Sequence, residues 1–207
     1  MPRRLVALCC AVAAVSGCGG GGSTGQPAAR ESGPSATPLD PARTATLADP
    51  DFDTAVPSDW HRRQSRKRGQ RFYYLNSGPG FASDYGIASR GEVGLTIATQ
   101  PSSDLPDGIS ARAAYERIVA TPDEATGTAR KPVRAARLDG AQAAMGQSTY
   151  RFKGRSMIQT NMVAIGRGVI VFIEVDAEPE DAAEGQRVLS TVVDSWRWSE
   201  RAAVVPS

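Results

Sequence analysis

The chain has 207 residues, of which 41% are hydrophobic and 22% are charged, and this suits one globular domain with a tail. The formal net charge is +2, and loss of the two arginines near the N-terminus would leave 22 basic residues against 22 acidic ones. Such a balance argues against a bulk nucleic-acid-binding protein, which carries a strong positive charge.

Residues 1–17 have the layout of a secretory signal peptide. Two arginines precede an apolar run over residues 5–15, which is too short to cross a bilayer because a spanning helix needs roughly 20 apolar residues. The last residue of this run and the three after it, Val15-Ser16-Gly17-Cys18, resemble a bacterial lipobox. The resemblance implies palmitate-type lipid on Cys18 and cleavage before it, so we expect a lipoprotein on the extracytoplasmic face of the plasma membrane. An ordinary signal peptide and twin-arginine export remain alternatives.

Few residues suit metal binding or thiol chemistry. Cys9 and Cys10 would leave with the signal peptide, and lipid would block Cys18, so no thiol would remain for a disulfide, a metal or a nucleophile. The single histidine is His61, and zinc sites need more nitrogen and sulfur ligands than that. The sequence therefore predicts no cofactor and no metal. With 21 arginines and 3 lysines, the composition also suggests a GC-rich, actinobacterial source.

Residues 18–50 are predicted to be the lipidated cysteine and a disordered linker. Glycine, proline and alanine dominate them, and Leu39 and Leu47 are the large aliphatic residues of the segment. Such a segment buries too little apolar area to offset the entropy lost on ordering. We expect the folded domain to run over residues 51–199, with a tail over residues 200–207.

Hydrophobic patterns predict several strands of an antiparallel sheet. They cover residues 72–75, 81–87, 93–98, 133–138, 141–152, 156–165 and 169–175. Asp139-Gly140, Lys153-Gly154 and Gly166-Arg167-Gly168 supply the tight turns, and connections this short impose antiparallel pairing. Residues 169–173 are apolar at every position, which predicts a central strand that is covered on both faces.

Two amphipathic helices are expected to cover that sheet. The first follows a cap at Ser110 and ends near Val119. The second begins near Pro179, where acidic side chains favour the positive end of the helix dipole, and it carries an apolar stripe to Trp196. The predicted fold class is α+β, with an antiparallel β-sheet flanked by helices.

Several segments of residues 51–199 resemble the PsbP-like superfamily. They are Phe52-x4-Pro57-x2-Trp60, the helix after a strand ending near Gln100, Leu138-Asp139-Gly140-x2-Ala143, the strand from Val169 to Val175, and Asp194-Ser195-Trp196. The superfamily includes an extrinsic subunit of photosystem II and the LpqN-type envelope lipoproteins of mycobacteria. The resemblance implies an α-β-α sandwich and a role in binding or assembly without catalysis. It supplies no catalytic residue.

A basic cluster is the leading candidate for a binding site. Its members are Arg62, Arg63, Arg66, Lys67, Arg68 and Arg71. Near a membrane each basic residue gains about 1 kcal/mol from anionic lipid head groups. We therefore expect an anionic-ligand patch for lipid or an acidic envelope protein, with no role for nucleic acid. The alternative is a solvated hairpin whose cations only balance the charge of the acidic residues elsewhere on the domain.

Other candidate residues have structural interpretations that we favour. His61 is expected to be a surface histidine at a strand start, and no Gly-x-Ser-x-Gly elbow accompanies it. The acidic residues Glu174, Asp176, Glu178, Glu180, Asp181 and Glu184 do not have EF-hand spacing for calcium. Trp60, Trp196 and Trp198 suit a sugar platform, but at these positions tryptophan is more often part of the core. Trp198 is the one we expect to be exposed.

The leading functional interpretation is a lipid-anchored domain that binds or assembles without catalysing a reaction, with a role in cell-envelope maintenance. Two alternatives remain. An apolar cavity with convergent polar groups would favour a carrier of a lipid or glycan intermediate. Two carboxylates facing each other across a cleft would favour an envelope hydrolase.

Overall fold

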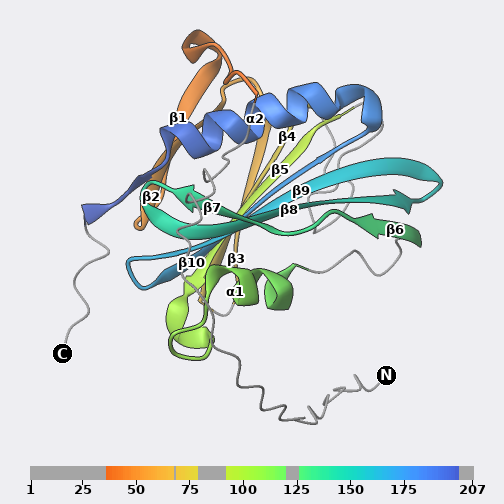
Figure 1. Ribbon diagram of the computed structural model, residues 1–207. Helices are drawn as coiled ribbons and strands as arrows, with labels where there is room; N and C mark the ends of the chain where they lie inside the picture. The colour runs from red at the N-terminus through yellow and green to blue at the C-terminus, as the bar shows by residue number, and fades with distance from the viewer. Residues whose placement is uncertain (1–35, 68, 79–91, 120–125, 201–207) are drawn as a thin grey trace, which may run out of the picture. The chain divides into compact units, whose positions relative to one another are not determined.

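A computed structural model describes residues 36–67, 69–78, 92–119 and 126–200 of the chain (Figure 1). All of them belong to one compact unit, residues 31–207. The predicted signal peptide, Cys18, the strand over 81–87 and the cation Arg68 lie outside the described residues. In the described ranges no helix combines the length and the apolar character needed to cross a membrane.

An eight-stranded antiparallel sheet forms the centre of the domain (Figure 1). Its order is β3 (His61–Lys67), β4 (Gln70–Asn76), β5 (Gly94–Pro101), β10 (Val169–Ala177), β9 (Arg155–Gly166) and β8 (Ala141–Phe152). Beyond β8, the last position is shared end to end by β6 (Thr126–Arg130) and β7 (Arg134–Leu138), which both pair with β8. The strands predicted for residues 133–175 are thus confirmed to within two residues.

The three predicted turns are confirmed as hairpins. Each has two consecutive residues with positive φ: 44° and 80° at Asp139 and Gly140, and similar values at Lys153-Gly154 and Arg167-Gly168. This is the backbone of the two-residue turn whose twist matches that of the flanking strands. The hairpins set the register of β7 to β10, and a long-range pairing with β5 makes β10 a central strand.

The two faces of the large sheet are covered differently. On one face lie α2 (Ala182–Ser195), the short 3-10 turn Pro179–Asp181 that leads into it, and a second sheet of three strands. That second sheet consists of β1 (Thr44–Ala48), β2 (Phe52–Pro57) and β11 (Arg197–Trp198). On the other face α1 (Ala111–Ile118) lies over β8 and β9, and Ser110 caps it by accepting a hydrogen bond from the Ala113 N–H.

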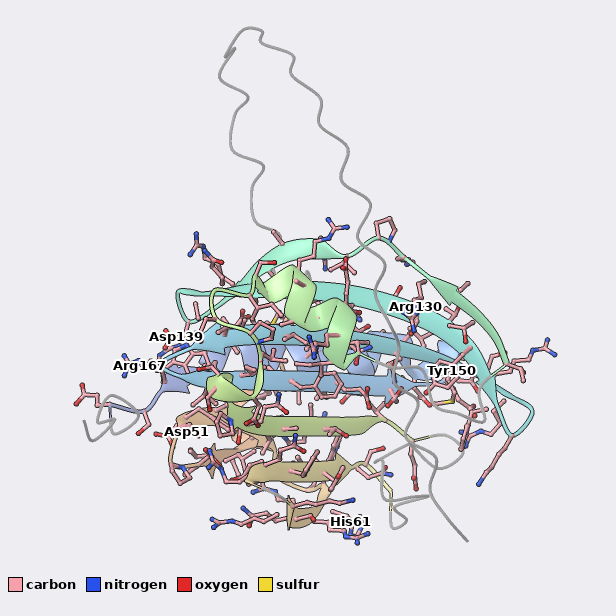
Figure 2. The ribbon with its side chains drawn as sticks, turned by 90° about the horizontal axis from the view of Figure 1, so that it is seen from below. Asp51, His61, Arg130, Asp139, Tyr150 and Arg167 are labelled. Atoms are coloured by element: carbon pink, nitrogen blue, oxygen red, sulfur yellow. The ribbon has the colours of Figure 1, made fainter. Side chains whose placement is uncertain are left out.

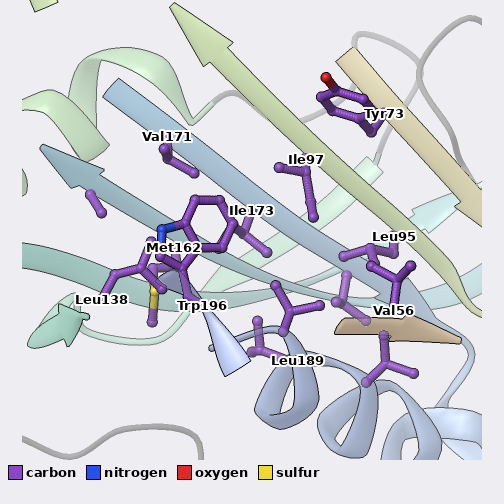
Figure 3. Packing of buried hydrophobic residues seen from close by; sticks show 14 of the residues in the cluster. Val56, Tyr73, Leu95, Ile97, Leu138, Met162, Val171, Ile173, Leu189 and Trp196 are labelled. Carbon is purple, nitrogen blue, oxygen red and sulfur yellow. The ribbon is translucent and has the colours of Figure 1, made fainter. Parts of the chain in front are cut away.

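The larger core lies between the sheet and the α2 layer (Figure 3). Trp196 is fully buried, and its ring stacks on Phe52 with centroids 4.0 Å apart. Leu95, Ile97 and Ile173 meet this layer from the central strands. A smaller core under α1 contains Tyr115, Val163 and Ile170 among other residues. Side chains from alternate positions of one strand therefore serve two cores, which explains why residues 169–173 are apolar throughout.

Two expectations need correction. The domain is mainly β, with two helices in the described residues, so an α-β-α sandwich describes it only in outline: one covering layer contains the three-stranded sheet as well as α2. The folded domain also begins earlier than residue 51. Leu39 is 8% exposed and belongs to the larger core, and β1 pairs with β2 along its whole length. The linker prediction failed there because it judged the segment by its own composition. Leu39 and Leu47 pack against a core that the rest of the domain forms, and this is enough to order the segment around them.

Candidate functional site

The basic residues of β3 lie at an edge of the large sheet. Among the described strands β3 pairs with β4 alone, and six of its seven side chains are exposed, Ser65 being the exception. Cross-strand register alternates the cations between the faces: Arg62 and Arg66 lie on the α2 side, while Arg63 and Lys67 lie on the α1 side. We call these four residues the β3 edge. His61 is exposed at the start of the strand, as expected (Figure 2).

Arg71 is set apart from the β3 edge. Its guanidinium donates hydrogen bonds of 2.8 and 3.0 Å to Asp49 and also pairs with Asp51. The Asp49 carboxylate is fully buried, and it accepts a further hydrogen bond from the Tyr73 hydroxyl. Burial and this bond raise the pKa of Tyr73 to about 12. Arg71 therefore ties the loop between β1 and β2 to β4, and the sequence could not separate this role from that of its basic neighbours.

A second basic edge lies at the other end of the sheet. Four cations follow one another along β6, the connection to β7 and β7 itself, and all four side chains are exposed: Arg130, Lys131, Arg134 and Arg137. We call them the β6–β7 edge. Residues 126–138 contain no carboxylate, and Arg137 donates to the neutral carbonyl of Gly140 at 3.1 Å. This run was not predicted from the sequence, although it holds as many cations in eight residues as β3 holds in six.

Polar side chains gather on the α1 side of the sheet where β8, β9 and β10 meet. The Tyr150 hydroxyl donates to Asp176 at 2.9 Å, and the carboxyl of Glu174, two residues back on the same face, is hydrogen-bonded to Asp176. Gln159 and Asn161 stand opposite the two acids in register, and the Asn161 amide donates to Gln159 at 3.0 Å. The two acids belong to the predicted acidic group. Their partners were not predicted, because they lie on other strands and meet the acids only through the register of the sheet.

The two carboxyl groups are held in a setting that favours their neutral forms. Burial raises the pKa of Glu174 well above its usual value, and the neighbouring Asp176 raises it further. Burial also raises the pKa of Asp176, to about 6, against hydrogen bonds from Tyr150, Glu174 and Gln159 that favour its charge. Carboxyl groups that bond directly to each other leave no room for a glycosidic bond or a water between them. This pair therefore lacks the spacing of the hydrolase alternative.

The rest of the acidic group is dispersed. Glu178 pairs with Arg155 beside an open surface cleft of about 420 Å³, and Glu184 pairs with Arg187 on α2. Glu180 is exposed, and Asp181 sits at the start of α2. Across the described ranges, no three side chains of His, Cys, Asp or Glu are grouped in a way that could hold a metal ion.

The three tryptophans all belong to the core. Trp60 and Trp198 are 8% and 7% exposed, so the expectation that Trp198 lies at the surface was wrong. The Trp198 indole N–H donates to the Leu138 carbonyl at 3.0 Å, and its backbone N–H donates to Asp139. Its ring also lies against Gly166, where a Cβ would come within 2.8 Å of it. The polar residues on either side of Trp198 in the sequence, Arg197 and Ser199, led to the wrong expectation, although the Trp198 ring is buried at the end of the core.

Comparison with known proteins shows the fold and no more. No protein-family model matches the sequence, and no curated protein matches it either. Among solved structures, cyanobacterial PsbP (CyanoP) from Synechocystis sp. PCC 6803 is similar over 80% of this chain and 98% of its own, with a TM-score of 0.52 and 13% identity. LpqN, described as involved in cell envelope biogenesis of Mycobacterium tuberculosis, is similar over 75% and 90%, with a TM-score of 0.40 and 13% identity. The chain thus has a PsbP-like fold.

Proposed function

We propose that this chain is a membrane-anchored extracytoplasmic lipoprotein whose PsbP-like domain binds its partners without catalysing a reaction. Lipid on Cys18 would hold the protein at the plasma membrane, and the residues that follow would act as a tether. The lipobox at Val15–Cys18 supports the anchor. The PsbP-like fold is compatible with an assembly or maintenance function in the cell envelope, where the anchor would hold the domain.

The observation that carries the binding role is the β3 edge. Its four cations are exposed on a strand that ends the described sheet, and they point to both faces, so an edge-on approach brings all of them toward one flat surface. Anionic lipid is the partner we propose, because the anchor would keep the domain beside it. A contact of about 1 kcal/mol per cation becomes effective when a tether holds the local concentration high.

Vesicle flotation tests this role. The lipid anchor by itself would carry the protein to any vesicle and hide a weak contact of the domain. The test therefore compares lipidated protein with a soluble form that begins at Ala36 and lacks the anchor. The soluble form should float with phosphatidylglycerol vesicles at low salt and should detach as salt screens the charges. Combined Arg62→Glu, Arg66→Glu and Lys67→Glu should abolish flotation while far-UV circular dichroism is retained. A wild-type domain that ignores these vesicles at low salt would leave the β3 edge as a solvated strand and refute the proposal.

A further inference from the structure

The β6–β7 edge lies at the end of the large sheet opposite to the β3 edge. Six strand steps separate β3 from β6, which at about 4.8 Å per step is roughly 29 Å along the sheet. Figure 2 shows this separation, with His61 of β3 at the bottom and Arg130 of β6 toward the top. Because the two edges lie at opposite ends of the sheet, a flat surface that meets one edge does not reach the other.

The cations of the β6–β7 edge are arranged in a line. Arg134 pairs with Met145 and lies on the α2 side, whereas Arg130 pairs with Ser148 and lies on the α1 side. Their side chains therefore do not converge on a single ion. Arg130 lies opposite Ser148 and Arg137 lies opposite Gln142, so the line covers six residue steps of β8, which at about 3.3 Å per step is roughly 20 Å. A ligand that contacts all of them must itself be long and must carry several negative charges.

Arginine supplies three of the four cations. A guanidinium matches phosphate with two parallel hydrogen bonds, and it gives up its hydration more readily than an ammonium does. All four side chains are exposed, so a ligand can reach them from solvent. We propose that the β6–β7 edge is a second binding surface, and that it takes a linear polymer bearing repeated phosphate groups. A domain with both contacts would link such a polymer to a lipid surface, although the polymer contact does not depend on the lipid contact.

The test uses the full lipidated protein in phosphatidylcholine vesicles, with polyphosphate of defined length as the probe. The β6–β7 variant combines Lys131→Glu, Arg134→Glu and Arg137→Glu. The matched control combines Arg62→Glu, Arg66→Glu and Lys67→Glu, and it changes the net charge by the same amount. We expect at least a tenfold loss of polyphosphate affinity in the β6–β7 variant, and a change of less than about threefold in the control. The dependence of affinity on salt should also weaken, by about 0.7 in the logarithmic slope for each phosphate that is no longer neutralised.

Four results would overturn the assignment. Equal losses of affinity in both variants would mean that only net charge matters. Polyglutamate that binds as tightly as polyphosphate would reject the preference for phosphate. Wild-type affinity in a well-folded β6–β7 variant would reject the surface itself. Finally, aggregation of the neutral set Lys131→Gln, Arg134→Gln and Arg137→Gln with unchanged binding would show that the cations only guard a strand edge against pairing. Circular dichroism and the single variant Arg134→Glu, for which we expect a partial loss, control for misfolding.

Discussion

The backbone N–H of Leu39 donates a 2.7 Å hydrogen bond to the hydroxyl of Thr191 on α2. It fastens the segment before β1 to a helix 152 residues further along the chain, and the Leu39 side chain enters the same core. The ordered domain therefore includes part of what composition describes as linker.

The first prediction concerns the boundary of the folded domain. A chain that begins at residue 49 lacks Leu39 and β1, so it should unfold at a clearly lower temperature than one that begins at residue 36. Leu39→Ala alone should cost about 2–3 kcal/mol in the free energy of unfolding, because it leaves a cavity in the core. Thr37→Ala is the matched control, since Thr37 is exposed. Equal stability of Leu39→Ala and Thr37→Ala in urea titrations would contradict this assignment of Leu39 to the core.

The second prediction concerns the tether. Deleting about ten residues within 19–35 should leave the melting temperature unaltered, because glycine- and proline-rich sequence of this kind buries little apolar area. Differential scanning calorimetry of the purified proteins measures it. A shift of several degrees would mean that this segment packs on the domain.

The third prediction concerns the anchor. Cys18→Ser should release the protein from the membrane fraction or leave it uncleaved, because each lipid methylene buried in the bilayer is worth about 0.8 kcal/mol and serine cannot form the thioether. Fractionation with mass spectrometry of the N-terminus measures both effects. Cys9→Ser is the control that should change neither. Full membrane retention of Cys18→Ser, with a mature N-terminus at another residue, would exclude the lipobox.

The fourth prediction follows from the paired carboxyl groups. The pKa values of Glu174 and Asp176 are raised in the folded state, that of Asp176 from 3.8 to about 6, so the folded state holds protons that the unfolded chain has released. Stability should therefore fall as the pH rises from about 4 through 6, and further as Glu174 ionises. Glu174→Gln removes one charge of the pair and should be more stabilising, relative to wild type, at pH 8 than at pH 5.

Denaturant unfolding of Glu174→Gln at the two pH values measures this difference. The exposed Glu180→Gln is the control, and its effect should not depend on pH in this way. A stability difference for Glu174→Gln that is the same at pH 5 and pH 8 would show that the pair is ionised in the folded protein.

The fifth prediction separates Arg71 from the β3 edge. Arg71→Gln leaves the buried Asp49 carboxylate without its cation, so it should cost about 3 kcal/mol of stability. Binding of the folded protein to anionic vesicles should stay within about twofold of wild type. Arg66→Gln, on the exposed edge, should do the opposite. Weaker vesicle binding by Arg71→Gln with unchanged stability would return Arg71 to the binding surface.

Periodicity and turn chemistry predicted the hairpins from β7 to β10 because each position of those strands has one dominant requirement. Val169 to Ile173 must be apolar on both faces, and Asp139-Gly140 must adopt positive φ. The pattern missed β1, whose burial is irregular along the strand, and β2, where the buried side chain of Thr54 is polar. It also failed for Trp198, where a single indole, hydrogen-bonded to Leu138, outweighs its polar neighbours.

The candidate sites were predictable to different degrees. A run of cations is visible in sequence, and the four of them that lie on β3 are exposed. Which cations are exposed was not visible, because Asp49 and Asp51 reach Arg71 across strands. The contact between Tyr150 and Asp176 depends on the register of three strands. The contact becomes visible in the sequence only after the three strands have been aligned, when the residues of β8, β9 and β10 that point to the same face can be compared.

Leu39 is buried near the start of the described chain, and its bond to Thr191 fixes that segment to α2. If the residues before it are the tether that we propose, a pull on them would load α2 and the larger core first. Neither basic edge would then carry that load directly. The cations of β3 and of the β6–β7 edge would therefore stay in place while the tether is stretched.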